Sequence, residues 1–174
     1  KQIVRAAFLS LLAPGPEEIC WDIGAGTGSV SIELAMLAGQ VYGVEQNAEA
    51  LALAEENRRM LGAWNLRLLE GKAPEALADL PAPDAVFVGG SSGNMRPVLE
   101  AIHEKNPQAR VCVSAIVLEN AAEAAAVLGE LGWETEVRQI SVSTSRTAGG
   151  KHMMTAQNPV FLILGTKEKT TDQT

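Results

Sequence analysis

Seven consecutive residues, 22–28 (DIGAGTG), have the residue types and the spacing that a nucleotide-like cofactor requires. They follow a short apolar run at residues 19–21 and precede an amphipathic helical pattern over residues 29–37. An α/β sheet binds such a cofactor where a strand ends in glycines and turns directly into a helix. Glycine is needed there because a Cβ would hold the backbone away from the ligand. We therefore predict a cofactor loop that contains Asp22, Gly24, Ala25, Gly26, Thr27 and Gly28.

The spacing of these glycines distinguishes between two classes of cofactor. A dinucleotide site has the pattern G-x-G-x-x-G, which would require glycine at position 29. That position is Ser29, and the third glycine comes one residue earlier, at Gly28. The G-x-G-x-G pattern led by Asp22 resembles the first motif of S-adenosylmethionine-dependent methyltransferases. The resemblance implies S-adenosylmethionine as cofactor and S-adenosylhomocysteine as product, and it leaves a nicotinamide-dependent dehydrogenase as a distant alternative.

Two further strand ends complete the predicted cofactor site. Glu45, followed by Gln46, ends the second predicted strand, where a carboxylate can accept hydrogen bonds from both ribose hydroxyls. The alternative for Glu45 is a solvated acid at a strand end. After the third strand, Gly71 allows close approach to the adenine, and the backbone of Ala73 could meet the ring. Lys72 cannot accept a hydrogen bond, so we expect backbone groups to recognise the adenine.

A glycine pair follows the fourth predicted strand, at Gly89 and Gly90, and Ser91 comes directly after it. Ligands of open α/β sheets bind outside the carboxyl ends of the strands. We therefore expect this segment to line the face from which the methyl group leaves, with Ser91 on the substrate side. The alternative is a tight loop without a functional role.

The composition argues against several kinds of partner. The net charge is −7 at pH 7, and no basic stripe of the kind that nucleic-acid binding requires is present. No apolar run is long enough to span a membrane, and no secretory signal pattern is visible. Cys20 and Cys112 lie in apolar runs and lack the spacing of zinc ligands. We expect a cytoplasmic protein that binds neither nucleic acid, membrane nor metal.

Apolar periodicity and turn residues predict alternating strands and helices. The predicted strands are residues 19–23, 41–45, 66–69, 85–88, 110–115, 133–142 and 160–164. The predicted helices are residues 3–12, 30–38, 48–61, 74–80, 95–104 and an Ala-rich segment that ends at Gly132. We expect Gly39 to end the second helix, and Asn47 and Asn120 to be N-caps.

The last two predicted strands have no helix between them. We expect them to pair antiparallel at one edge of an otherwise parallel sheet. This order is that of class I methyltransferases: an α/β, Rossmann-like fold with a mostly parallel seven-stranded sheet and an antiparallel last strand. We expect one domain over residues 1–166, with an N-terminal helix, and a polar tail over residues 167–174 that frays.

Six segments together resemble one family: residues 22–28, 43–47 (GVEQN), 70–77 (EGKAPEAL), 88–93 (VGGSSG), 114–120 (SAIVLEN) and 153–160 (MMTAQNPV). From residue 4 to residue 164 the chain resembles the decarboxylating precorrin-6Y carbon-15 methyltransferases. This family occurs as a free enzyme and as the C-terminal half of a fused cobalamin-biosynthesis enzyme. Lys72 departs from the acid that is common at its position. The resemblance implies methylation of a tetrapyrrole at carbon-15, loss of carbon dioxide from the ring-C acetate, and a homotetramer.

A tetrapyrrole with many carboxylates requires cations to be concentrated locally on this acidic chain. Arg146 and Lys151 flank residues 147–150, which we expect to be flexible. We predict that both contact substrate carboxylates, and Arg146 can do so with two parallel hydrogen bonds. The alternative is two ordinary surface charges. His152 and Glu119 are weak catalytic candidates; packing or surface exposure is the alternative for His152, and helix capping or solvation for Glu119.

Three other functions stay open at this point. One is a methyltransferase acting on RNA, and another is a methyltransferase acting on a different small molecule. RNA would favour a basic, aromatic-lined face, which the sequence lacks. The third is a non-catalytic cofactor-binding subunit, and the intact glycines and Glu45 argue against such a decayed site. A cofactor titration separates this last alternative from an enzyme.

Overall fold

The structure, a computed structural model, describes residues 2–91 and 93–167. Its helices are α1 (Gln2–Leu12), α2 (Ser29–Ala35), α3 (Ala48–Met60), the 3-10 helix η1 (Glu75–Leu77), α4 (Met95–Lys105) and α5 (Leu118–Glu130). Its strands are β1 (Ile19–Ile23), β2 (Gln40–Glu45), β3 (Leu66–Glu70), β4 (Ala85–Val88), β5 (Arg110–Ala115), β6 (Glu134–Ile140), β7 (Ser143–Ala148), β8 (Lys151–Ala156) and β9 (Val160–Thr166).

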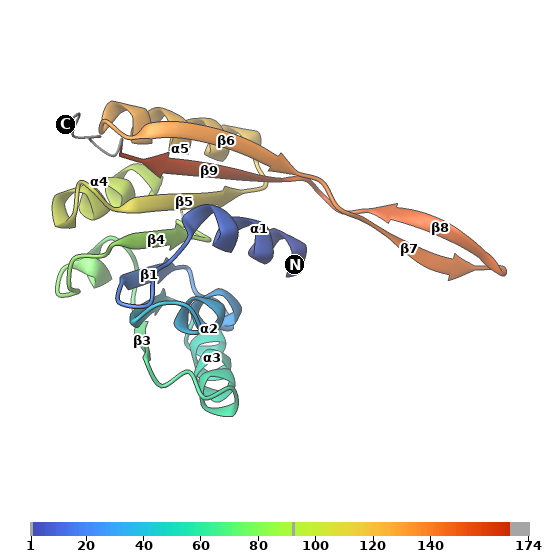
Figure 1. Cartoon of the computed structure of the whole chain (residues 1–174), viewed down its shortest axis with the longest axis horizontal. Coiled ribbons are helices and arrows are strands. Elements are labelled where there is room, and N and C mark those ends of the chain that lie inside the picture. Colours follow the sequence, from blue (N-terminus) through green and yellow to red (C-terminus); the bar gives the residue numbers. More distant parts are fainter. Residues whose placement is uncertain (1, 92, 168–174) are drawn as a thin grey trace, which may run out of the picture.

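Seven of these strands form one sheet in the order β3-β2-β1-β4-β5-β9-β6 (Figure 1). β1 pairs in parallel with both β2 and β4, and the parallel pairing continues to β3 and to β5. β9 runs antiparallel to β5 and to β6. The predicted mostly parallel seven-stranded sheet with an antiparallel last strand is therefore confirmed. The strand order reverses beside β1, and α/β sheets bind their ligands at such a reversal.

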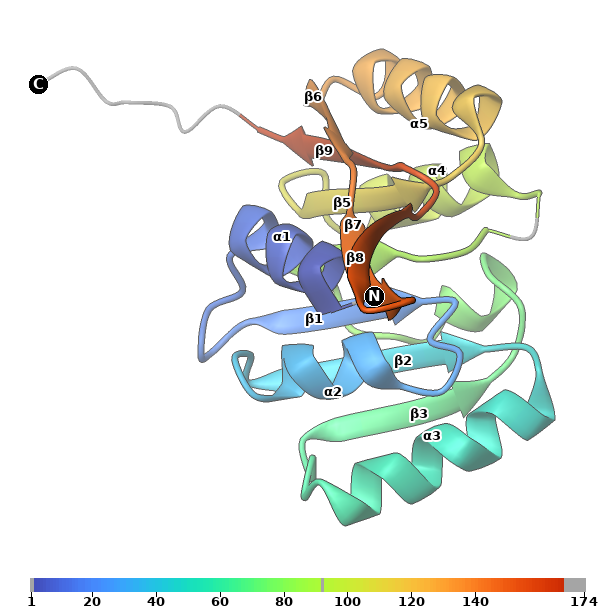
Figure 2. The same cartoon turned by 90° about the vertical axis from the view of Figure 1, so that its right-hand side faces the viewer.

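Helices cover both faces of the sheet, so its central strands are apolar on both sides. In β4, Val86 and Val88 belong to the core layer that contains α4 and α5. Ala85 and Phe87 alternate with them and belong to the layer of α1 and α2. Phe87 stacks on Phe8 of α1 with ring centroids 4.1 Å apart. Figure 2 shows α1 and α2 in front of the sheet.

The cysteines lie in this second layer. Cys20 of β1 and Cys112 of β5 are free and buried. Burial raises the pKa of each thiol to about 12. Both therefore act as small apolar core residues at neutral pH.

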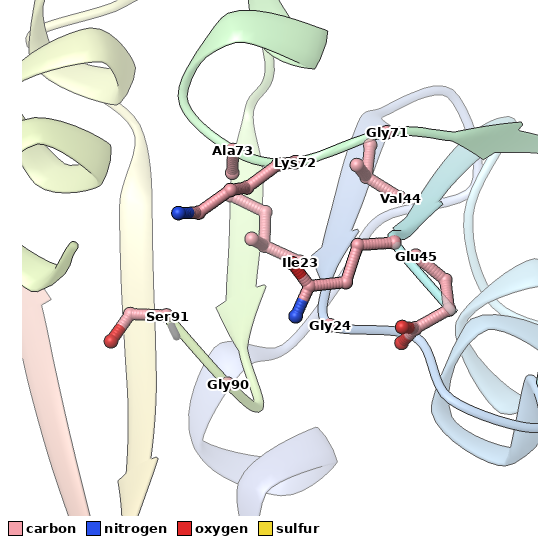
Figure 3. Close-up of a pocket in the computed structure, with 10 residues that line it drawn as sticks. Ile23, Gly24, Val44, Glu45, Gly71, Lys72, Ala73, Gly90 and Ser91 are labelled. Atoms are coloured by element: carbon pink, nitrogen blue, oxygen red, sulfur yellow. The ribbon is translucent and has the colours of Figure 1, made fainter. Parts of the chain in front are cut away.

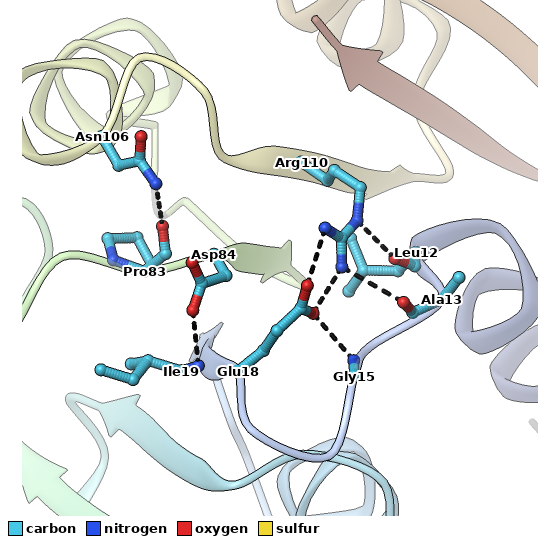
Figure 4. Close-up of polar contacts among 9 residues, drawn as sticks. All are labelled: Leu12, Ala13, Gly15, Glu18, Ile19, Pro83, Asp84, Asn106 and Arg110. Atoms are coloured by element: carbon cyan, nitrogen blue, oxygen red, sulfur yellow. Dashed lines mark hydrogen bonds and ion pairs between the residues drawn. The ribbon is translucent and has the colours of Figure 1, made fainter. Parts of the chain in front are cut away.

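A polar cluster centred on Arg110 joins α1 to the sheet (Figure 4). The guanidinium donates to the carbonyls of Leu12 and Ala13 at 2.9 and 3.2 Å. It also donates to both carboxylate oxygens of Glu18, at 3.1 and 2.6 Å. Glu18 accepts a further hydrogen bond from the backbone of Gly15 at 2.8 Å. The hydrogen bonds from Arg110 hold the pKa of Glu18 below its usual value.

Two predicted helix boundaries are wrong. α2 ends at Ala35, because the backbone tightens into a turn in which Leu37 donates to the carbonyl of Leu34 at 2.9 Å. Gly39 is therefore not its terminal glycine. A Cβ at Gly39 would lie 3.0 Å from the carbonyl oxygen of Pro16, so this glycine allows the close approach of two loops. The helix predicted over residues 74–80 is only the short η1.

The two predicted N-caps have opposite outcomes. Asn47 caps α3, and its side chain accepts a hydrogen bond from the backbone of Ala50 at 2.9 Å, as predicted. The prediction for Asn120 is wrong, because α5 begins at Leu118 and places Asn120 inside the helix. The N-cap position is Val117, whose side chain has no oxygen to accept a hydrogen bond.

The segment between β6 and β9 forms a hairpin that the sequence analysis did not predict. β7 and β8 pair antiparallel in a separate two-stranded sheet, and Gly149 and Gly150 turn between them with φ of +57° and +74°. Figure 1 shows this hairpin projecting away from the rest of the chain. Every residue of β7 and β8 is exposed. Of the stretch expected to be flexible, residues 147 and 148 belong to β7 and residues 149 and 150 form the turn, and its flexibility stays a prediction.

Lys167, the first residue of the predicted polar tail, is attached to the rest of the chain. Its ammonium group donates to the carbonyls of Leu131 and Gly132 at 3.1 and 2.5 Å. The prediction of fraying is therefore wrong for Lys167, and residues 168–174 lie outside the described residues. Among the helices that the structure describes, none is long and apolar enough to cross a bilayer.

Candidate functional site

Two glycines shape the loop between β1 and α2 for different reasons. Gly24 has a φ of +79°, and a Cβ there would lie 2.9 Å from the backbone nitrogen and oxygen of Gly90. Gly26 has a φ of +55°, and a Cβ there would meet no atom within 4 Å. Gly24 therefore allows two loops to approach closely, whereas Gly26 borders open space in which a ligand can lie against the backbone.

Glu45 joins the end of β2 to this loop. One carboxylate oxygen accepts the backbone N–H of Gly26 at 2.8 Å, and the other accepts the backbone N–H of Asn47 at 2.8 Å. A carboxylate oxygen can accept two hydrogen bonds, so each oxygen of Glu45 keeps one acceptor site. The carboxylate is therefore anchored by the protein and still able to bind two adjacent hydroxyl groups.

Asp22 lies beneath the loop and is fully buried. Its Oδ2 accepts a hydrogen bond from the hydroxyl of Ser31 at 2.5 Å, and its Oδ1 has no partner within the described residues. Burial raises the pKa of Asp22 to about 7, although the hydrogen bond from Ser31 opposes this rise. Asp22 therefore supports the loop from below, and its carboxyl group titrates at a higher pH than an exposed aspartate does.

A cleft of about 220 Å³ opens at the carboxyl ends of the central strands (Figure 3). It is lined by Ile23, Gly24, Val44, Glu45, Gln46, Gly71, Lys72, Ala73, Gly90 and Ser91. In Figure 3 the Lys72 side chain extends toward the side where Ser91 lies, and the Glu45 carboxylate lies at the opposite side. The ends of four strands, β1 to β4, were predicted separately and meet around one cavity.

The sequence analysis missed two lining residues, Ile23 and Val44. Each comes at the end of a buried strand, Ile23 directly before Gly24 and Val44 directly before Glu45. This position in the chain is a signal that could have identified them. They add apolar surface to a cleft whose other walls are largely backbone and polar side chains.

Six predicted cofactor residues are not among the residues that line the cleft: Asp22, Ala25, Gly26, Thr27, Gly28 and Gly89. Asp22 belongs to β1, and the other five lie in the loops that follow β1 and β4. The carbonyl of Thr27 accepts a hydrogen bond from the Asn57 side chain at 3.0 Å, which ties the loop to α3. Gly28 is the N-cap residue of α2. Gly26 borders open space, and the other five residues are placed to hold the loops in position.

Four of the residues predicted to bind substrate or to act in catalysis lie outside the cleft. Arg146 is in β7, and Lys151 and His152 are in β8, so all three belong to the projecting hairpin. Glu119 lies in the first turn of α5 and is exposed. Among the predicted substrate-side residues only Ser91 lines the cleft. The methionines beside His152, Met153 and Met154, are exposed and do not form core.

Three consecutive apolar residues, Ile116, Val117 and Leu118, are exposed directly after β5. In the pairing of β4 with β5, Val88 lies opposite Val113. The segments that follow the two strands therefore leave the sheet at the same edge. An apolar ledge thus lies on the β5 side of the loop that contains Gly90 and Ser91, and the sequence analysis did not assign it a role.

The strand order, the glycine loop after β1 and the acid at the end of β2 define a class I methyltransferase fold. The chain belongs to the precorrin methyltransferase domain family, whose model matches residues 1–167.

Individual relatives agree with this assignment. The chain is 38% identical over 162 residues to a protein of Methanothermobacter thermautotrophicus named probable cobalt-precorrin-6B C(15)-methyltransferase (decarboxylating), covering 92% of this chain and 84% of the relative. The Salmonella typhimurium protein of that activity is 36% identical over 173 residues, covering 97% and 89%. A crystal structure of a precorrin-6Y C5,15-methyltransferase from Geobacter metallireducens superimposes with a TM-score of 0.91 at 34% identity, covering 97% of this chain and 88% of that one.

Proposed function

We propose that this protein transfers a methyl group from S-adenosylmethionine to carbon-15 of a precorrin or cobalt-precorrin tetrapyrrole. In the same conversion the ring-C acetate loses carbon dioxide, as a step of cobalamin biosynthesis. The observation that carries the proposal is the anchored Glu45 carboxylate beside the open backbone at Gly26, in a chain of the precorrin methyltransferase family. The names of relatives at 36–38% identity support the choice of carbon atom and the decarboxylation.

The residues present fit S-adenosylmethionine. The unused acceptor sites of Glu45 suit the two ribose hydroxyls, and the space at Gly26 suits a ligand held against the backbone. The segment formed by Gly71, Lys72 and Ala73 would lie beside the adenine, with recognition through backbone groups. Gly90 also borders open space, since a Cβ there would meet no atom within 4 Å.

The bound cofactor supplies an electrophilic methyl group on a sulfonium. The work of the protein is then to hold an electron-rich substrate carbon in line with that group and to exclude water, and such positioning can contribute about 7–11 kcal/mol. Ser91 and the loop at Gly90 are the lining residues on the substrate side. The exposed ledge of Ile116, Val117 and Leu118 suits the apolar face of a macrocycle.

We propose that the chain forms a homotetramer, as the family resemblance implies, and the projecting β7–β8 hairpin supports contact between copies. An isolated two-stranded hairpin is only marginally stable in water. All of its strand residues are exposed in the single chain, with Met153 45% and Met154 64% exposed. We expect other copies of the chain to cover these side chains. We also propose that residues 1–166 form one domain and that the protein works in the cytoplasm, where its two free cysteines stay reduced.

The assembly is tested by analytical ultracentrifugation of a Met153→Glu/Met154→Glu variant. We expect it to sediment as smaller species than the wild type, because the charges would have to be buried at the interface. The matched control is Met60→Glu on α3, where the side chain is 73% exposed in the single chain. If the hairpin variant sediments as a tetramer, the hairpin does not form the contact between copies of the chain.

The reaction is tested by incubating the protein with methyl-labelled S-adenosylmethionine and cobalt-precorrin-6B or its metal-free counterpart. Methyl incorporation and carbon dioxide release are followed together. We expect both with at least one of the two tetrapyrroles, and neither with a Gly26→Val variant. Methylation without carbon dioxide release would contradict the decarboxylation, and the absence of both would contradict the proposed function.

A further inference from the structure

Most basic side chains of this chain are engaged with the chain itself. Within residues 2–91 and 93–167, ion pairs hold Arg5, Arg58, Arg59, Arg96, Arg110 and Arg138. Lys105 and Lys167 donate to backbone carbonyls, and Arg67 lies over the ring of Tyr42. The Lys and Arg side chains of this described part that have no such contact are Lys72, Arg146 and Lys151.

These three cations can bind an anionic ligand without first breaking an ion pair. They lie in two separate places. Lys72 lines the cleft, whereas Arg146 and Lys151 lie on the β7–β8 hairpin. In the hairpin register Arg146 pairs with Met153 and Lys151 with Ala148, so both cations lie in the half of the hairpin nearer its turn. The hairpin strands contain no Asp or Glu, although the chain as a whole carries a net charge of −7.

The hairpin carries its cations away from the body of its own chain. Each of its strands has six residues, which corresponds to a length of roughly 20 Å. All of these residues are exposed, and Figure 1 shows the hairpin extended beyond the sheet and helices. A second copy of the chain is therefore better placed than the same copy to receive Arg146 and Lys151.

The proposed substrate needs more cations than the cleft provides. Among the residues that line the cleft, Lys72 is the one free cation that can bind a carboxylate of the tetrapyrrole. The surrounding chain is acidic and would repel such a substrate, so further cations have to be brought to the cleft. The cationic hairpin is complementary in charge both to the substrate and to the acidic body of another copy.

We propose that the substrate site is composite, with the β7–β8 hairpin of one copy reaching the cleft of a second copy. There Arg146 and Lys151 bind substrate carboxylates on the side of the cleft where Lys72 lies, and Arg146 can do so with two parallel hydrogen bonds. Neither residue contacts the cofactor. This inference rests on the proposed function, and it adds that a single copy holds the cofactor but an incomplete substrate site.

Equilibrium binding gives the first test. An Arg146→Ala/Lys151→Ala variant should bind S-adenosylmethionine as the wild type does and bind cobalt-precorrin-6B at least ten-fold more weakly. The matched control is Arg138→Ala, which removes an exposed arginine from the neighbouring β6. Unchanged tetrapyrrole affinity in the double variant would overturn the proposal.

Subunit complementation gives the decisive test. Gly26→Val chains, which keep an intact hairpin, are co-expressed with Arg146→Ala/Lys151→Ala chains, which keep an intact cleft. Two different affinity tags isolate the mixed oligomers. If hairpins act on a neighbouring copy, about a quarter of the wild-type activity should return on random mixing, because half of the clefts are intact and half of those meet an intact hairpin. At tetrapyrrole concentrations well below saturation, Gly26→Val chains alone should be inactive, and the double-variant chains alone should keep about a tenth of the wild-type activity or less.

The outcomes separate this proposal from the proposed function. Mixed oligomers without activity, beside an active wild type in the same assay, would show that each hairpin serves its own chain or serves no site. That result would overturn the composite site and leave the methyltransferase activity standing. A wild type that methylates neither tetrapyrrole would overturn the proposed function, and the composite site with it.

Discussion

The backbone N–H of Gly26 donates to a carboxylate oxygen of Glu45 at 2.8 Å, across 19 residues of sequence. This hydrogen bond joins the loop after β1 to the end of β2. The second carboxylate oxygen accepts from Asn47, so both oxygens of Glu45 are oriented before any ligand binds. Orientation of this kind lowers the entropy lost on binding.

Glu45→Gln should therefore bind S-adenosylmethionine about 10- to 100-fold more weakly, since a charge-assisted hydrogen bond contributes about 1.5–3 kcal/mol. The amide has one acceptor oxygen for the two N–H groups that the carboxylate now satisfies. Isothermal titration calorimetry measures the change. Glu123→Gln, an exposed site on α5, is the control, and equal affinities in the two variants would contradict the assignment.

Gly26→Val should abolish measurable cofactor binding and leave the circular dichroism spectrum native. The space beside Gly26 is open, so the added side chain occupies the volume expected for the ligand, while the φ of +55° strains the valine backbone and should lower the thermal midpoint. Gly24→Ala should also lower the thermal midpoint, because its Cβ would lie 2.9 Å from the Gly90 backbone. Normal cofactor affinity in Gly26→Val would refute the proposed loop.

The pH dependence of stability should reveal Asp22. Its pKa is raised to about 7 in the folded chain, so the folded state binds more protons than the unfolded state between about pH 4 and 7. The contribution of Asp22 to stability is therefore highest below pH 4, and it decreases as the pH rises to 7. Asp22→Asn removes this titration. The free energy of unfolding of the variant, relative to that of the wild type, should rise by at least about 1.4 kcal/mol between pH 4 and 8, the value of one pKa unit. Urea unfolding at pH 4 and at pH 8 measures this difference in free energy, and a difference that is the same at both pH values would contradict the raised pKa.

Arg110→Ala should lower the free energy of unfolding by about 2 kcal/mol, the range expected for hydrogen bonds to a charged group. The loss should be greatest above pH 5. Because the pKa of Glu18 is lower in the folded chain than in the unfolded chain, Glu18 stabilises the folded state at a pH above its pKa in the unfolded chain. This stabilisation disappears as the pH falls through the pKa that Glu18 has in the folded chain. Thermal unfolding of Arg59→Ala, whose partner lies at 3.4 Å on an exposed helix face, provides the comparison. Equal losses in the two variants would mean that the cluster does not anchor α1.

Local patterns predicted most of the fold and the cofactor half of the site. The boundaries of β1, β4 and β5 matched the prediction because each is a short apolar run between turn residues. Gly24 and Gly26 were identifiable because their spacing directly encodes a backbone shape. The prediction for Asn120 was wrong because an Asn beside an Ala-rich run can also lie inside the helix, and α5 begins two residues earlier, at Leu118.

The substrate half was less predictable. Their charge identified Arg146 and Lys151 as candidates, but the sequence analysis did not predict that they lie on a projecting hairpin. The Gly149–Gly150 pair between two polar segments is a hairpin signal, but the polar segments lack the apolar alternation that marks a strand packed on a core.

The sequence by itself determined the class of fold and the cofactor loop, because both depend on residue types at short spacings along the chain. Tertiary structure alone decided which residues share the cleft, that Asp22 is buried beneath it, and that the cations of the hairpin lie apart from it. These relationships depend on strand order and on the direction in which a hairpin leaves the sheet. They are set by contacts between segments distant in sequence, which no local spacing records.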